Sequence, residues 1–220
     1  MPILLGSTVL RGLAVVAVVV ASGTFVLFVA PVGCGALVNL DSALADAYHA
    51  PASAVALVNG VGGGALGALG AILGGALADR VNRRFAYCAS AFVTALVCFA
   101  MALAPVNAAT YAWGILAYRF VNGVTMAAFA GMVLELVSHG PAVATKYSLF
   151  VALSNQAIGY VTYLDGLAST FHGVGAVGTV VFDGVITLVG IAIVGAMTLV
   201  TSSARARAFR RSLPSDGAPR

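Results

Sequence analysis

The sequence predicts an all-helical integral membrane protein, built as a bundle of six transmembrane helices with both chain ends in the cytoplasm. Of its 220 residues, 61% are hydrophobic and only 8% are charged, whereas about a quarter of the residues in a soluble domain are charged. The mean hydropathy is +1.04. Because so few polar side chains cannot cover a water-soluble globule, we expect the bilayer to be the solvent for most of the chain.

Apolar runs of the length needed to cross the hydrocarbon core, about 20 residues each, follow one another along the chain. The first contains Pro31 and is too long for a cleaved signal peptide. We expect residues 1–203 to form the six-helix domain and residues 204–220 a basic cytoplasmic tail, in a multi-pass protein of the plasma (inner) membrane. The six expected spans are residues 12–38, 51–78, 85–104, 111–137, 147–169 and 175–200.

Lysine and arginine residues occur in every second connection between these spans. Arg80, Arg83 and Arg84 lie between the second and third spans, and the alternate connections, such as residues 39–50, contain no lysine or arginine. Lysine and arginine collect on the cytoplasmic side of membrane proteins, so both termini are expected there. The net charge of +4 reflects this topology, and no nucleic-acid partner is expected.

No pattern in the sequence predicts an enzyme, a metal site or a cofactor. The cysteines fall inside apolar spans without Cys-x-x-Cys spacing, and the histidines are isolated near span ends. No nucleophile, zinc-protease or nucleotide-binding motif occurs. The residues concerned are Cys34, Cys88, Cys98, His49, His139 and His172.

The turn between the second and third spans reads GALADRVNRR and resembles a signature loop of the major facilitator superfamily of secondary transporters. The resemblance implies that the aspartate caps or pairs across to a neighbouring helix, and that the arginines clamp one conformation of the cytoplasmic face. A loop that only sets topology is the alternative. Asn82 replaces a glycine of the signature, which we expect to be tolerated because asparagine readily adopts left-handed backbone angles. The matching residues are Gly75, Asp79, Arg80, Arg83 and Arg84.

Two further segments resemble the same superfamily. Arg119 and Gly123 match an Arg-x-x-x-Gly pattern in its fourth helix, and residues 144–155 resemble the start of helix eleven in muropeptide-permease-like members. The family has twelve helices in two six-helix repeats, and six are expected here.

The resemblance implies a half-size secondary transporter that moves a small solute by alternating access, coupled to protons. It would need a second six-helix unit, either another copy in a homodimer or a separately encoded half. The alternative is a non-transporting membrane subunit, or the remnant of a split or truncated transporter.

Glycines of the second span share one helix face. Gly60, Gly63, Gly67, Gly70 and Gly74 fall within about a quarter of the helix circumference. In lipid, small residues allow helix backbones to approach closely. We therefore expect a tight helix–helix seam, with a sliding surface as the alternative.

Polar residues form one face of the fifth span. Lipid would leave their amides without partners, so we expect the face to meet protein or a water-filled cavity. Contact with solute and hydrogen bonding between helices are both open. The face comprises Ser148, Asn155, Gly159, Thr162, Tyr163 and Gly166, with Gln156 at its edge.

Four charged residues lie within the expected spans: Arg119, Glu135, Asp165 and Asp183. Arg119 and Asp183 lie at a similar depth in their spans, so we predict that they pair, with Asp165 as the alternative partner, and that a carboxylate there carries a coupling proton. Glu135 is expected to reach the membrane interface. The candidate pathway residues are Arg119, Asn122, Asn155, Gln156, Tyr163, Asp165 and Asp183.

Overall fold

The computed structural model describes residues 32–33, 35–138, 142–170 and 175–212, with side chains up to residue 199. This part of the chain is helical and contains no strand, which confirms the all-helical prediction. In chain order the elements are the 3-10 helix η1 (Ala36–Leu40) and the α-helices α3 (Asp41–Ala47), α4 (Ala52–Asn59), α5 (Val61–Arg80), α6 (Arg83–Leu103), α7 (Ala108–Val137), α8 (Val143–Ala168) and α9 (Gly175–Ser212).

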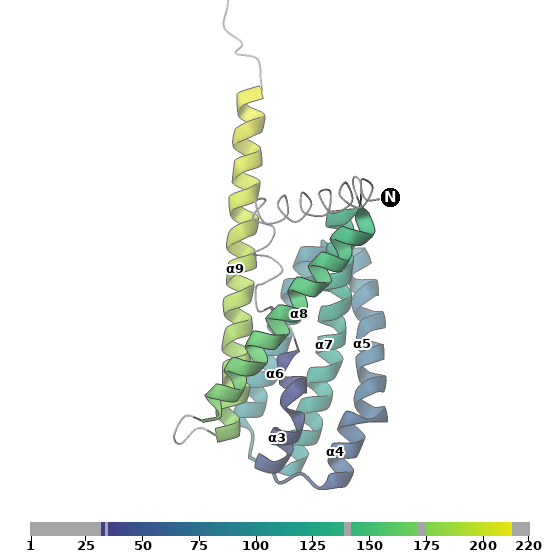
Figure 1. Cartoon of the computed structure of the whole chain (residues 1–220), viewed down its shortest axis with the longest axis vertical. Coiled ribbons are helices and arrows are strands. Elements are labelled where there is room, and N and C mark those ends of the chain that lie inside the picture. Colours follow the sequence, from purple (N-terminus) through teal and green to yellow (C-terminus); the bar gives the residue numbers. More distant parts are fainter. Residues whose placement is uncertain (1–31, 34, 139–141, 171–174, 213–220) are drawn as a thin grey trace, which may run out of the picture.

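The long helices run up and down in a bundle, and α8 crosses it obliquely (Figure 1). The α5–α6 turn and the start of α8 lie at one end, here called the basic end, which carries Arg80, Arg83 and Arg84. The short helix α3 and the α6–α7 turn lie at the other end, here called the acidic end, with Asp41 and Asp46.

Four helical segments of the described chain are long and apolar enough to cross a membrane, which identifies the features of an integral membrane protein. Large apolar side chains such as Val61, Ile72 and Trp113 point outward and are exposed. An apolar exterior of this kind suits lipid and not water. The four segments are Ala52–Arg80, Arg83–Leu103, Ala108–Val137 and Gly175–Leu199.

Most of the expected first span lies outside the described residues, and its described end is not a continuous helix. Gly33 and Gly35 have φ of 50° and 77°, values in the left-handed region that favours glycine. A short 3-10 helix follows them. The prediction of one helix to residue 38 is therefore wrong at this end, because two positive-φ glycines interrupt it.

The other spans form helices close to their expected bounds, with three differences. Gly60, with φ −98° and ψ −129°, interrupts the second span between α4 and α5. The fifth span forms the 26-residue helix α8, which is not among the four apolar segments. The helix α9 continues to Ser212, into the expected basic tail.

Asparagine side chains begin two of the long helices. The side-chain oxygen of Asn107 accepts the Thr110 backbone N–H at 2.9 Å at the start of α7. Asn82 does the same for α6, accepting from Arg84 and Phe85 at 3.0 and 3.3 Å. Such caps satisfy backbone donors that the helix itself leaves unpaired.

The glycine face of α5 packs directly against α7, as predicted. A Cβ atom on Gly70 would lie 2.0 Å from the carbonyl oxygen of Phe120, and one on Gly74 would lie 2.5 Å from that of Val124. From the α7 side, a Cβ atom on Gly123 would lie 2.2 Å from the Gly67 oxygen. The backbones therefore approach more closely than any larger residue would allow.

Candidate functional site

Two aspartates from neighbouring helices meet inside the bundle near the acidic end. Asp165 of α8 and Asp183 of α9 are 0% and 1% exposed. The Tyr118 hydroxyl and the Cys98 thiol donate to Oδ2 of Asp183 at 3.0 and 3.3 Å. Four helices, α6 to α9, thus contribute side chains to one buried polar cluster, here called the carboxyl pair site.

The two carboxyls face each other and can form a hydrogen bond. Neither oxygen of Asp165 receives a hydrogen bond from any other donor in the described chain. Two carboxylate groups contain no hydrogen-bond donor, so a bond between them requires a proton on one. The ion pairs in the described residues involve other acids, Asp41, Asp79 and Glu135.

Two unpaired negative charges side by side in an apolar interior are strongly unfavourable. A pair in this setting shares a proton instead, as two close carboxyl groups do when neither has a cationic partner. The carboxyl pair site can therefore hold a proton in the bundle interior and release it when water or a cation gains access.

Arg119 does not reach this site, and its predicted pairing with Asp183 is wrong. Its Nη2 contacts the carboxylate of Asp41 and donates to Oδ1 of Asn59 at 2.7 Å. Asp41 begins α3, and Asn59 ends α4. The connection at residues 39–50, which was expected to be an external loop, packs against α7 and brings the Asp41 carboxylate to Arg119. Spacing along the sequence does not reveal this contact.

Several polar atoms around this ion pair have no hydrogen-bond partner in the described chain. Burial raises the pKa of the Asp41 carboxyl above its ordinary value, and the neighbouring Arg119 charge opposes that rise without cancelling it. Burial likewise raises the pKa of the Tyr48 phenol. The unpaired atoms are Oδ1 of Asp41, the hydroxyls of Tyr48 and Tyr111, and Nε of Arg119.

The predicted pathway residue Asn122 supports the backbone at the positive-φ residue Gly33. Its Nδ2 donates to the Gly33 carbonyl at 3.3 Å, and the Tyr87 hydroxyl donates to the Val32 carbonyl at 3.1 Å. Thr162 of α8 completes this support, donating to the Ala36 carbonyl at 3.5 Å. Non-helical backbone inside a membrane bundle needs such partners, because lipid offers none.

The remaining pathway candidates, Asn155, Gln156 and Tyr163, are exposed on the outer side of α8. Gly159 on the same face has open space around it. The structure therefore does not bring these residues to the carboxyl pair site. Their face, here called the α8 outer face, is a polar surface on an otherwise apolar bundle.

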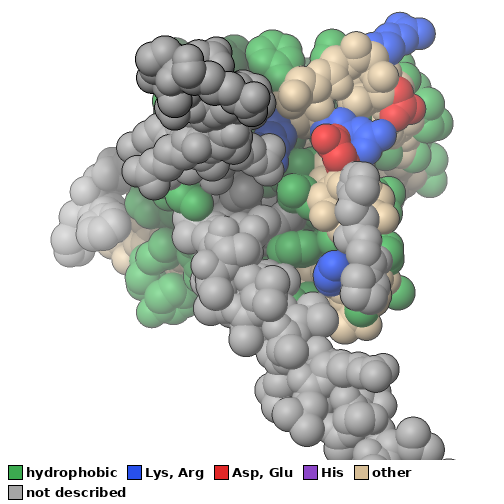
Figure 2. All heavy atoms as spheres, turned by 90° about the horizontal axis from the view of Figure 1, so that it is seen from above, with side chains coloured by type: hydrophobic (Ala, Val, Ile, Leu, Met, Phe, Trp, Pro, Cys, Tyr) green, Lys and Arg blue, Asp and Glu red, His purple; other side chains and the backbone are tan. Residues whose placement is uncertain are grey.

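At the basic end, Arg83 connects three helices. Its guanidinium lies 3.9 Å from Asp79 of α5 and 3.7 Å from Glu135 of α7, and it donates to the Gly131 carbonyl at 3.2 Å. Figure 2 shows basic and acidic side chains gathered together on this end of the molecule. Asp79 therefore contacts Arg83, four residues further along the chain across the α5–α6 turn, and its role in clamping the cytoplasmic face stays a prediction.

The interpretation of Asn82 was wrong. Its φ is −57° and its ψ is 124°, so it is not left-handed. It serves instead as the N-cap of α6, for which asparagine is among the best residues. Gly75 has open space around it, and Arg80 is exposed.

The chain matches no protein-family model, no curated protein and no solved structure. The resemblance to the major facilitator superfamily therefore stays a prediction that rests on the motif residues. Within the described residues, no group of three histidine, cysteine or acidic side chains is placed to hold a metal ion.

Proposed function

We propose that the protein is a proton-coupled secondary transporter of half size, which moves a small solute by alternating access together with a second six-helix unit. The observation that carries this proposal is the carboxyl pair site. Asp165 and Asp183 are fully buried, face each other and have no cationic partner in the described chain. Ionisable side chains inside a membrane bundle are costly to keep and typically mark proton or substrate pathways.

The need for a second unit is supported by the α8 outer face. Asn155, Gln156 and Tyr163 expose amide and phenol groups on a bundle whose other helices expose apolar side chains. Contact with lipid would leave these groups without hydrogen-bond partners. A second bundle on this face would enclose them, and alternating access requires two bundles that move around a shared site.

The proposal is tested by solute accumulation in inverted membrane vesicles. Vesicles with the full-length chain are energised and exposed to a defined mixture of amino acids, dipeptides, sugars, nucleosides and organic amines, and the accumulated compounds are identified by mass spectrometry. We expect at least one compound to accumulate, and an uncoupler to abolish the accumulation.

Asp183→Asn should abolish accumulation, because an amide cannot exchange the proton, while Asp46→Asn on the exposed side of α3 should not. Accumulation that survives both Asp165→Asn and Asp183→Asn would contradict proton coupling at this site. If well-folded protein accumulates nothing from any mixture, with or without a co-expressed partner, the chain is a non-transporting subunit or a remnant.

A further inference from the structure

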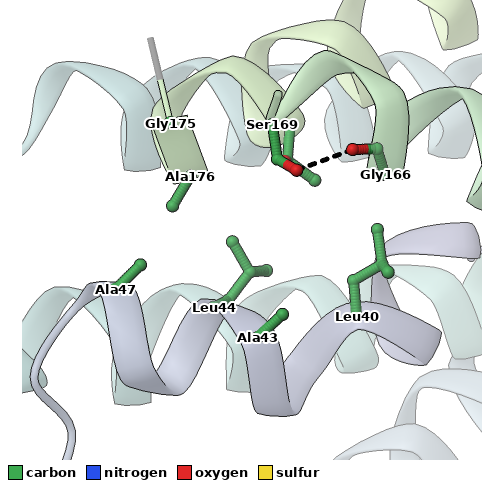
Figure 3. Close-up of a pocket in the computed structure, with 9 residues that line it drawn as sticks. Leu40, Ala43, Leu44, Ala47, Gly166, Ser169, Gly175 and Ala176 are labelled. Carbon is green, nitrogen blue, oxygen red and sulfur yellow. Dashed lines mark hydrogen bonds between the residues drawn. The ribbon is translucent and has the colours of Figure 1, made fainter. Parts of the chain in front are cut away.

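A cavity of about 180 Å³ opens at the acidic end between α3, α8 and α9. Figure 3 shows Ala43, Leu44 and Ala47 of α3 facing Gly166 and Ser169 of α8 across it. The α3 side is entirely apolar, whereas the opposite wall contains the hydroxyls of Ser169 and Thr179. This space is here called the α3 pocket.

The inner wall of the α3 pocket adjoins the carboxyl pair site. Gly166 directly follows Asp165 in α8, and Thr179 precedes Asp183 by one turn of α9. The acids themselves are shielded from the pocket, since Asp165 is 0% exposed and Asp183 1%. The pocket wall thus includes residues within one helical turn of both acids along the chain, whereas the acids themselves do not line it.

An ion pair and the buried side chains of Leu44, Ala45 and Tyr48 hold α3 over this pocket. Asp41, the first residue of α3, contacts Arg119 of α7, and the same guanidinium bonds Asn59 of α4. The helix has only seven residues and lies between two positive-φ positions, Gly35 at 77° and His49 at 54°. A short helix flanked by such positions can move as a unit when its fastening is released.

The fastened arrangement leaves hydrogen-bonding capacity unused. Oδ1 of Asp41, Nε of Arg119 and the hydroxyls of Tyr48 and Tyr111 are buried without partners in the described chain. Each such atom raises the free energy of the closed state, because it has lost water and gained no replacement. If α3 moves and admits water, the water can form hydrogen bonds with these atoms. Those bonds would offset part of the free energy that is lost when the ion pair breaks.

We infer that the α3 pocket is the route by which water, and with it the coupling proton, reaches Asp165 and Asp183 from the acidic end, and that α3 is its gate. The Asp41–Arg119 pair holds the gate shut. The role of this gate in transport rests on the proposed function. The access of water and ions through the α3 pocket can be tested without measuring transport.

Cys98 is a built-in reporter of this route, since its thiol is fully buried and donates to Asp183 at 3.3 Å. The assay uses the full chain with Cys34→Ser and Cys88→Ser, so that Cys98 is the cysteine that reacts. Silver ions are applied to membranes that contain this protein, and the protein is then denatured and labelled with a maleimide. The rate at which maleimide labelling of Cys98 is lost measures the access of silver ions to the thiol. We expect Asp41→Asn to accelerate silver blocking about tenfold or more, because one partner of a buried ion pair is lost.

Asp46→Asn is the matched control, because it removes the same charge from an exposed position of the same helix. It should leave the rate of blocking unchanged. An unchanged rate in Asp41→Asn, or equal acceleration in Asp46→Asn, overturns the inference.

A second experiment avoids the concern that Asp41→Asn disturbs folding. Ala43→Cys and Ser169→Cys, which face each other across the pocket in Figure 3, are joined in the folded protein by a short reducible bifunctional thiosulfonate. The bridge should slow silver blocking of Cys98, and reduction should restore it. Blocking that continues at the same rate with α3 bridged shows that the route lies elsewhere.

The two proposals fail separately. Solute accumulation that continues with α3 bridged contradicts the gate and leaves the transporter intact. Cys98 access that follows the state of α3 in a protein that accumulates no solute supports the gate and contradicts the transporter.

Discussion

Arg119 of α7 forms an ion pair with Asp41 of α3, and this contact leaves Asp183 without a cationic partner in the described chain. The relationship separates the buried acids of the described chain into two sets. One is a charge-compensated pair that joins α3 to α7 and α4. The other is a pair of acids with no cation beside it, which reduces its negative charge by sharing a proton.

The Arg119–Asp41 pair predicts a non-additive effect of mutation on stability. Arg119→Gln alone should destabilise the folded protein by about 3–5 kcal/mol, because it leaves a buried carboxylate unpaired. Combining it with Asp41→Asn should recover much of that loss. Thermal unfolding in detergent, followed by the loss of monodisperse protein, measures the four members of the cycle. If the stability losses of the two single variants simply add, the residues are not partners. Arg119→Gln combined with Asp183→Asn is the control pair, for which additive losses are expected.

The seam between α5 and α7 predicts different outcomes for two similar glycine substitutions. Gly70→Ala should destabilise the protein by about 1–3 kcal/mol, because its Cβ would lie 2.0 Å from the Phe120 oxygen. Gly64→Ala on the same helix should be neutral or slightly stabilising, because nothing lies within 4 Å of its Cβ. The midpoint temperature of unfolding distinguishes them. Equal effects at both positions would mean that α5 does not pack on α7 through this face.

The α8 outer face predicts contact with a second unit. In a cysteine-free background, Gly159→Cys should crosslink to a second chain in native membranes, since this position has open space around it and lies beside exposed polar residues. Val61→Cys, at a position that is 86% exposed on α5, is the control and should crosslink far less. Equal crosslinking at the two positions would argue against a specific interface on α8.

The distribution of basic residues predicts the orientation in the membrane. A reporter that is active only in the cytoplasm should be active when fused after Arg84 or Arg211 and silent when fused near Asp46. These fusions place the basic end in the cytoplasm and the acidic end outside. The reverse activity at any two of the three positions would overturn the assigned topology.

Helix positions in the described chain were predictable because apolar runs of membrane-spanning length are separated by short polar segments. Asn82 and Asn107 begin α6 and α7 as caps, close to the expected bounds. The seam through Gly70 and Gly74 was also predictable, since helical periodicity alone places the glycines on one face.

The pairing of charges was not predictable in the same way. Depth along each span placed Arg119 level with Asp183, but Asp41 approaches the arginine through a short helix that folds back at the acidic end. Two positive-φ glycines precede that short helix: Gly33 lies against Ala91 of α6, and Gly35 lies against Asn122 of α7. Hydropathy does not depend on backbone angles, so an interruption of the helix within an apolar run could not be predicted from it.

The most direct test of proton coupling at the carboxyl pair site is whether Asp165 and Asp183 share a proton. Infrared spectroscopy of the full chain in lipid at neutral pH, with isotope-labelled aspartate, distinguishes protonated from ionised carboxyl groups. We expect a protonated aspartate signal whose frequency or intensity changes in Asp165→Asn and in Asp183→Asn and stays the same in Asp46→Asn. A spectrum with no protonated aspartate, or one whose protonated signal is unchanged in both of these variants, would contradict a shared proton.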